Sequence, residues 1–320
     1  MTHSTADRHS PKRLAVIAGM LSIYIFWGST YLAMKFAIES IPPFLMAGIR
    51  FSTAGVIFIL WRLLSGDALP TARQVLSAAV VGLFLLVGGN GCVVWAEQHV
   101  DSGITSVLVA TAPLWMIVID AVFLKRRPTG AAAAGVILGF TGTLLLVGPA
   151  QVPGLESGID KVGTGVLLVA AVLWAAGSLI ARDADLPASP MLGSGLEMLC
   201  AGVVLLLIGT ANGEWSRFSP AAVSARSLYS LGFLIFFGSL AGFGAYTWLL
   251  RNVATTVVST YAYVNPVIAV FLGAVLAHEP VTPRTLWSTA IIISAVMLIN
   301  IAQSRGRKVP AVESEPVRAA

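Results

Sequence analysis

Long apolar stretches alternate with short polar connections along almost the whole chain. Each stretch holds about 20 residues, enough for a helix to cross the roughly 30 Å hydrocarbon core of a bilayer. Charged residues, prolines and glycines mark the connections. The pattern predicts ten transmembrane helices, over residues 14–34, 43–64, 74–96, 103–124, 131–148, 162–181, 190–211, 228–250, 256–277 and 284–302. The expected fold class is an all-α integral membrane protein.

The composition excludes a soluble domain. Hydrophobic residues make up 57% of the chain and charged residues 11%, whereas soluble domains carry about a quarter charged residues. The net charge of +5 comes from basic residues in connections and tails, so we expect no nucleic-acid partner. Cys92 and Cys200 lie inside apolar stretches without a CxxC motif or a His cluster. We therefore expect no disulfide, no metal and no cofactor.

The basic residues also indicate how the helices are oriented. With ten crossings and the N-terminus inside, fourteen of the 20 Lys and Arg residues fall on the inner side and five on the outer side, while Arg50 lies within a span. Cytoplasmic connections of membrane proteins are enriched in Lys and Arg. We therefore expect a multi-pass protein whose polar tails, residues 1–13 and 304–320, both lie in the cytoplasm.

The second half of the chain repeats the first. Shifts of 147 and 153 residues superimpose an ordered series of positions: Trp27 on Trp174, Pro43 on Pro190, Arg50 on Glu197, Trp95 on Trp248 and Pro113 on Pro266. Each half holds five spans, an odd number, so the second half must enter the membrane from the opposite side. The sequence predicts two inverted five-helix repeats over residues 14–150 and 160–303. Such repeats are typical of secondary transporters with a substrate site near the midplane.

Several short motifs follow the order found in a known family. They are Trp27-Gly28-Ser29-Thr30-Tyr31, Ala47-Gly48-Ile49-Arg50-Phe51, Gly88-Gly89-Asn90-Gly91, and Tyr261-Ala262-Tyr263-Val264-Asn265-Pro266 with Glu279 after it. Through these motifs residues 14–301 resemble the drug/metabolite transporter superfamily and, within it, the ten-span permeases of the EamA family, with YedA-type permeases as the nearest subfamily. Arg126 stands where this family has an acidic residue after the fourth span.

The resemblance implies a secondary transporter of the bacterial inner (cytoplasmic) membrane. It would move small metabolites, such as amino acids, related compounds or drugs, commonly outward and by alternating access. A channel or a membrane sensor is the alternative that the sequence leaves open. An intramembrane enzyme is disfavoured because there is no HExxH motif, no Ser/His dyad and no Walker A sequence. The expected partners are a small-molecule substrate and the lipid bilayer.

Glycine pairs with GxxxG spacing bear on the oligomeric state. Gly135 and Gly139 form one pair, and Gly238 and Gly242 form the other. This spacing lets two helices approach closely, either within one chain or between chains. We favour packing within the chain, and a monomer or a weak homodimer is the expected state.

Two ionisable residues inside spans are the leading candidates for function. Arg50 and Glu197 each lie seven residues after a helix-opening proline, about 10 Å into their helices. Ionisable groups at such depth are costly and tend to face a cavity or a partner. Because the two helices start on opposite sides, we expect Arg50 in the outer vestibule, where it attracts a carboxylate or positions outer-gate residues. We expect Glu197 in a corresponding role on the cytoplasmic side, without a direct ion pair. The alternatives are that Arg50 extends to the interface and that Glu197 is a structural hydrogen-bonding group.

Aromatic and amide side chains complete the candidate substrate-binding or gating set. Tyr24 and Trp27 share a helical face in the first span, and Trp174 is the repeat partner of Trp27. Asn90 lies among three glycines, and Asn265 precedes Pro266, which predicts a broken or bent helix. Helix packing is the competing role for Asn90 and Asn265, and anchoring at the membrane interface is the competing role for the aromatic residues. The family motif adds two further candidates, Tyr261 and Tyr263.

Overall fold

A computed structural model describes residues 13–123, 125–148 and 160–306 of the chain. All regular structure within these ranges is helical. Nine helical segments there are long and apolar enough to cross a membrane, and Tyr261–Leu276 is a shorter apolar helix. These segments coincide with the predicted spans to within a few residues and confirm the all-α membrane fold class. The predicted tails, apart from 13 and 304–306, and residues 124, 149 and 150 lie outside the described ranges.

The helices follow one another up and down through one bundle. The first part of the chain forms α1 (Arg13–Ala37), α2 (Pro43–Leu64), α3 (Ala72–Gly82), η1 (Leu83–Gly91), α4 (Cys92–Ala96), α5 (Ser102–Val109), α6 (Ala112–Val122) and α7 (Gly130–Val147). The second part forms α8 (Lys161–Asp183), α9 (Pro190–Ala211), α10 (Glu214–Arg217), η2 (Pro220–Ala222), α11 (Ala225–Phe233), η3 (Leu234–Ala241), α12 (Gly242–Asn252), α13 (Thr255–Val258), α14 (Tyr261–Leu276) and α15 (Pro283–Gly306).

Helix ends are set by residues that the sequence places in the polar connections. Thr71 and Gln74 form a reciprocal capping box at the start of α3, and Asp160 accepts a hydrogen bond from the backbone N–H of Gly163 at the start of α8. Pro43 and Pro190 occupy the first turn of their helices, where a missing N–H costs nothing. Within the apolar stretches, backbone groups can pair only with one another, and a helix satisfies them all.

Four spans depart from simple helices. The third and eighth spans contain π-helical stretches, η1 and η3, the fourth is interrupted between α5 and α6, and the ninth between α13 and α14. The sequence predicts a helix that is broken or bent at Asn265 and Pro266; α14 is not broken there, because it runs through Pro266 and the interruption lies before Tyr261. Pro266 is only the sixth residue of α14, so its missing N–H removes a bond from the first turns. The α15 helix also extends to Gly306, beyond the predicted start of the tail.

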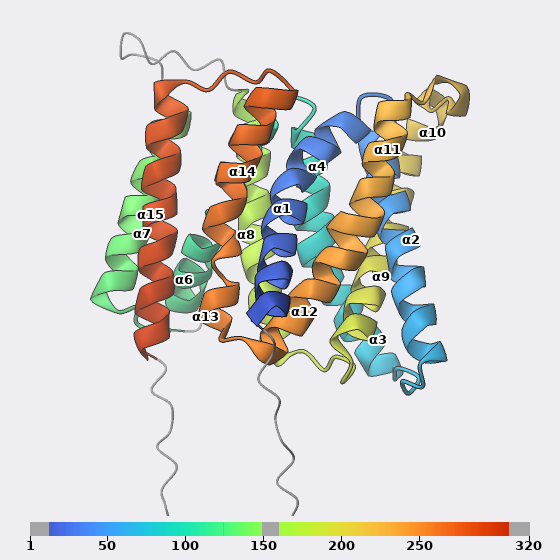
Figure 1. Cartoon of the computed structure of the whole chain (residues 1–320), viewed down its shortest axis with the longest axis horizontal. Helices are drawn as coiled ribbons and strands as arrows, with labels where there is room; N and C mark the ends of the chain where they lie inside the picture. Colours follow the sequence, from blue (N-terminus) through green and yellow to red (C-terminus); the bar gives the residue numbers. More distant parts are fainter. Residues whose placement is uncertain (1–12, 124, 149–159, 307–320) are drawn as a thin grey trace, which may run out of the picture.

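The bundle has both described chain ends on one face. Figure 1 shows that α1 begins and α15 ends at the lower face, while α2, α5 and α11 begin at the upper face. The closest helix pairs join distant parts of the sequence: α2 packs against α9, α7 against α15, α1 against α14, and α8 against η1. The core therefore lies between the two parts of the chain rather than within each.

The contact between α2 and α9 is reciprocal. A Cβ atom added to Gly55 would lie 2.6 Å from the backbone nitrogen of Leu199, and one added to Gly202 would lie 2.5 Å from that of Ser52. The shift of 147 residues carries Gly55 onto Gly202 and Ser52 onto Leu199. Each helix thus presents the same glycine to the same position of the other, as in a two-fold contact.

Candidate functional site

Three charged side chains form a cluster of ion pairs at the upper face of the bundle. Lys35, in the last turn of α1, places its Nζ 2.8 Å from Asp101 Oδ1 and 2.8 Å from Glu279 Oε1. Glu279 also accepts hydrogen bonds from Ser102 Oγ and from the backbone N–H groups of Ser102 and Gly103, at the start of α5. The cluster of Lys35, Asp101 and Glu279, called here the upper ion cluster, therefore joins α1, α5 and the end of α14.

Glu279 is held in its charged form. Burial alone would raise the pKa of its carboxyl, but hydrogen bonds from Lys35 and from the backbone of Gly103 and Ser102 outweigh burial, and the pKa lies below its ordinary value. The positive end of α5 acts in the same direction. From the sequence, Glu279 is expected only as part of the family motif, and the fold brings it together with Lys35.

Arg50 is buried in the upper half of the bundle. Its side chain is 4% exposed; its Nε donates to Ser239 Oγ at 3.1 Å, and its guanidinium carbon lies 4.7 Å from the centre of the Phe51 ring. Ser239 belongs to the π-helical η3. Arg50 Nη1 has no hydrogen-bond partner. Arg50 therefore does not extend to the interface, and it keeps a donor available.

Glu97 is the residue that the sequence reasoning missed. It follows α4, is 3% exposed, and neither of its carboxylate oxygens has a hydrogen-bond partner. Burial raises the pKa of its carboxyl well above the ordinary value; the Glu279 charge adds to this, and Lys35 and Arg50 oppose it. The sequence held one indication of its position: Glu97 follows the third span and Lys35 lies at the end of the first span, and both spans end on the same face of the bundle.

Trp27 lies in an aromatic group built by three helices. Its ring centre is 5.1 Å from that of Tyr261 on α14 and 5.2 Å and 5.4 Å from those of Tyr246 and Phe243 on α12. The indole Nε1 donates to the backbone oxygen of Gly238 at 3.1 Å. Two predicted site residues, Trp27 and Tyr261, are thus brought into contact at edge-on angles that aromatic pairs favour.

Tyr24 and Asn265 link α1 to the ninth span. The Tyr24 hydroxyl is hydrogen-bonded to Thr260 Oγ1. With its amide nitrogen facing two carbonyl oxygens, Asn265 donates to the backbone of Tyr24 and of Tyr261, each at 3.2 Å. The Asn265 amide is therefore occupied by contacts within the bundle, as the packing alternative requires. Tyr263 is half-buried against the main core.

Trp174 packs against Gly89, the neighbour of Asn90 in η1. A Cβ atom on Gly89 would lie 2.7 Å from Cε3 of Trp174, and one on Gly242 would meet the indole of Trp27. The shifts of 147 and 153 residues relate these two contacts, Trp27 to Trp174 and Gly89 to Gly242. Asn90, next to Gly89, has a buried Oδ1 without a hydrogen-bond partner. Its amide oxygen is therefore free for a ligand.

Glu197 stands apart from the other candidates. It lies on α9, half-buried, where a Cβ atom on Gly82 would lie 2.6 Å from its backbone oxygen. The first turn of α2 meets Glu214, just after α9, so α2 and α9 run antiparallel. Arg50 and Glu197, each near the start of its helix, therefore lie toward opposite ends of the bundle, and the described residues include no ion pair between them.

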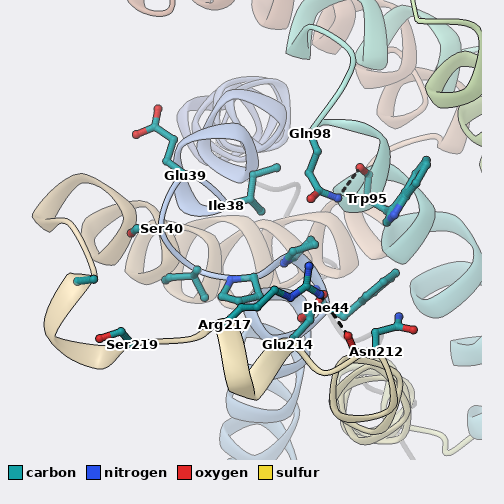
Figure 2. A pocket seen from close by; sticks show the side chains of 14 residues that line it. Ile38, Glu39, Ser40, Phe44, Trp95, Gln98, Asn212, Glu214, Arg217 and Ser219 are labelled. Carbon is teal, nitrogen blue, oxygen red and sulfur yellow. Dashed lines mark hydrogen bonds between the residues drawn. The ribbon is translucent and has the colours of Figure 1, made fainter.

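A cavity of about 740 Å³ opens at the upper face. Its walls come from the connection between α1 and α2, the end of α4 and the α10 segment (Figure 2). Glu214, 2% exposed, fixes one wall by accepting hydrogen bonds from the backbone N–H groups of Phe44 and Leu45. Trp95 of α4 and Gln98, two residues after the end of that helix, line the cavity and flank Glu97 in the sequence. Within the described ranges no group of three His, Cys, Asp or Glu side chains could hold a metal.

The two GxxxG pairs pack inside the chain. A Cβ atom on Gly135 would meet Ile299 of α15, and one on Gly139 would meet Leu114 of α6. Gly238 faces Thr30 and Arg50. Both pairs are thus accounted for by contacts within one chain.

Comparison with known proteins gives one consistent result. The model of the EamA-like transporter family matches residues 14–148 and again residues 161–301. The chain is 37% identical over 290 residues to the uncharacterized inner membrane transporter YedA of Escherichia coli (strain K12), covering 90% of this chain and 91% of that protein. It is 27% identical over 301 residues to the uncharacterized transporter YoaV of Bacillus subtilis (strain 168), covering 92% and 99%.

A solved structure supports the fold. A crystal structure whose title is "Crystal structure of protein" superimposes with a TM-score of 0.62 at 18% sequence identity, over 93% of this chain and all of the other. At that identity the match concerns the arrangement of helices alone.

Proposed function

Because the chain belongs to the EamA-like transporter family, we propose that it is a secondary transporter that exports small metabolites, among them amino acids and related compounds, by alternating access. The family establishes the transporter role, and the substrate class, direction and mechanism are the proposal. The observation that carries it is Arg50, a buried guanidinium with one unpaired nitrogen in the upper half of the bundle. A guanidinium in such a place is suited to a carboxylate ligand.

Two inverted halves, residues 14–150 and 160–303, would supply the moving parts. The reciprocal contacts of Gly55 and Gly202 support an inverted relation between the halves. The packing of Trp27 against Gly242 and of Trp174 against Gly89 supports it as well. The repeat relates α1 to α8, and α14 to α5 and α6. The contact of α1 with α14 therefore has a counterpart in the contact of α8 with α5 and α6, and both contacts are present. Alternating access would then be the rocking of one half against the other around a fixed site.

The proposed location is the inner (cytoplasmic) membrane with both termini in the cytoplasm. The basic residues of the connections support this orientation. The upper face, with the ion cluster and the cavity, would then be the outer face, and Glu197 would lie on the cytoplasmic side. In this arrangement Arg50 serves the outer vestibule and the aromatic group around Trp27 lies beneath it.

A metabolite panel tests the proposal. Intracellular accumulation in a deletion strain is compared with that in an overexpressing strain, with and without a protonophore, and the metabolites that change are then tested in proteoliposomes. A carrier gives saturable counterflow, which we expect. Ohmic conductance in planar bilayers would instead support a channel, and the absence of any flux would contradict transport.

Replacing Arg50 with lysine is expected to lower transport of the identified metabolite by about tenfold or more, with normal protein levels. A lysine ammonium keeps the charge but lacks the planar fork of the guanidinium, so it cannot hold Ser239 with one nitrogen while a second, separate nitrogen meets a carboxylate. The measurement is initial counterflow rate per reconstituted protein. Arg73→Lys is the control. The Arg73 side chain is 84% exposed, and its ion pair with Asp185, at 3.5 Å, is also exposed. Full transport by Arg50→Lys would contradict carboxylate binding by Arg50.

A further inference from the structure

Arg50 and Glu97 are buried near each other, and each has polar side-chain atoms without a hydrogen-bond partner. Glu97 has two unpaired carboxylate oxygens, and Arg50 has an unpaired Nη1. The two groups interact electrostatically, yet they are not among the ion pairs of the described chain. Burying a charge without a partner is costly. A ligand with a negative group at one end and a positive group at the other would satisfy both.

The other groups around Glu97 do not fill this role. Tyr31 and Lys35 face it from α1, and Glu279 faces it from the connection after α14. Lys35 is already bonded to Asp101 and Glu279, at 2.8 Å each. Glu279 has the same sign of charge as Glu97. Arg50 is thus the cation that faces Glu97 with a donor to spare.

Resting on the proposed transport function, we propose that Arg50 and Glu97 form the two ends of a subsite for a zwitterion. Arg50 Nη1 donates to the carboxylate of the ligand, and Glu97 accepts hydrogen bonds from its primary ammonium. An α-amino acid carries both groups on one carbon. A simple amine or a simple carboxylic acid would leave one buried charge without a partner and would bind less tightly.

The cavity at the upper face gives this subsite an approach. Trp95 and Gln98, which line the cavity, flank Glu97 in the sequence, and Gln98 Nε2 donates to the Trp95 backbone oxygen at 3.0 Å (Figure 2). The carboxyl of Glu97 itself is turned inward and is 3% exposed. A small rearrangement of this helix end would connect the cavity with the subsite.

Ligand binding at Glu97 is coupled to protons. Burial raises the pKa of the empty Glu97 carboxyl, so the empty site keeps its proton up to a higher pH than an exposed carboxyl does. An ammonium group lowers that pKa again and favours the ionised form. The carboxyl O–H bond then breaks and the proton passes to water, so zwitterion binding should strengthen as the pH rises toward neutral.

The experiment compares ligands that differ only in charge. Purified full-length protein is screened with the standard amino acids by thermal shift and by counterflow in proteoliposomes. The best of them is then compared with its decarboxylated amine and its deaminated acid, for example L-leucine, 3-methylbutylamine and 4-methylpentanoate. We expect the zwitterion to bind about tenfold or more tightly than either analogue.

Glu97→Gln separates the proposal from a structural role for this residue. The variant should retain folding and lose the preference for the zwitterion over the deaminated acid, and the rise of affinity with pH should disappear. Asp185→Asn, an exposed residue paired with Arg73 and not lining the cavity, should change neither. A charge preference and pH profile that survive in Glu97→Gln would overturn the subsite. Transport without any preference for zwitterions would do the same, whereas no transport by the wild type would contradict the proposed function itself.

Discussion

Gly202→Leu should prevent the protein from folding. A Cβ atom at Gly202 would lie 2.5 Å from both the backbone nitrogen and the Oγ of Ser52 and 3.0 Å from the backbone oxygen of Gly48. Overpacking against movable side chains costs about 1–3 kcal/mol, and here the neighbours are largely backbone, which cannot move aside. The expected result is loss of the monodisperse peak in detergent and about a tenfold lower yield from membranes.

Gly165→Leu is the matched control for this prediction. Gly165 lies on α8, and a Cβ atom there would have no neighbour within 4 Å. Both variants add the same side chain to a transmembrane helix, so a difference between them reports the contact and not the glycine substitution itself. Gly55→Leu should behave like Gly202→Leu, because the contact is reciprocal. A normal yield and melting temperature for Gly202→Leu would show that α2 and α9 are not held at this distance.

Glu279→Gln should lower the melting temperature by roughly 5–10 °C at neutral pH. The carboxylate accepts from Lys35, Ser102 and Gly103, and glutamine removes the charge opposite Lys35 while turning an NH₂ group toward a donor. Removing one partner of a buried ion pair costs about 3 kcal/mol or more, which corresponds to a shift of this size in a protein of several hundred residues. The measurement is thermal unfolding of purified protein in detergent.

The pH dependence of this effect has a definite sign. Because the pKa of Glu279 is lowered from 4.5 in the folded protein, its stabilisation is present above the unfolded pKa and is lost as the pH falls through the folded pKa. The difference between wild type and Glu279→Gln should therefore shrink below about pH 4.5. Glu39→Gln should show almost no difference at any pH, since its ion pair is exposed. A constant gap down to low pH would mean that Glu279 does not act through its charge.

Most of the fold could be predicted from the sequence because lipid imposes one solution on each apolar stretch. The interruptions could not. Pro266 predicts a broken or bent helix, yet a new helix begins at Tyr261 and continues through the proline. The N–H that Pro266 lacks would have bonded within the first two turns of this helix, so its loss affects only the helix start. The π-helical stretches η1 and η3 carry no composition signal, although both lie where Trp174 or Trp27 packs against a glycine.

The candidate site was predictable in part. Arg50 stood out because its charge lies inside a span, and its burial agrees with that reasoning. Glu97 and Asp101 lie just past span ends, where charge is ordinary, so the sequence places Glu97 on the same face as Lys35 but does not indicate burial or pairing. Their environment depends on how α1, α4, α5 and α14 meet, which is a property of the packed bundle. The direct contact of Trp27 with Tyr261 likewise joins helices that are far apart in the chain.

The glycine contact between α2 and α9 also bears on how the protein could open. Gly55 and Gly202 each lie against the backbone of the other helix. A change in the angle between the two helices would therefore separate few interdigitated side chains at this point. At the upper face, by contrast, Lys35 would have to leave Asp101 or Glu279 before α1 and α5 could separate. Separation of α1 from α5 would therefore be resisted by one lysine and its two carboxylates, and not by the contact between α2 and α9.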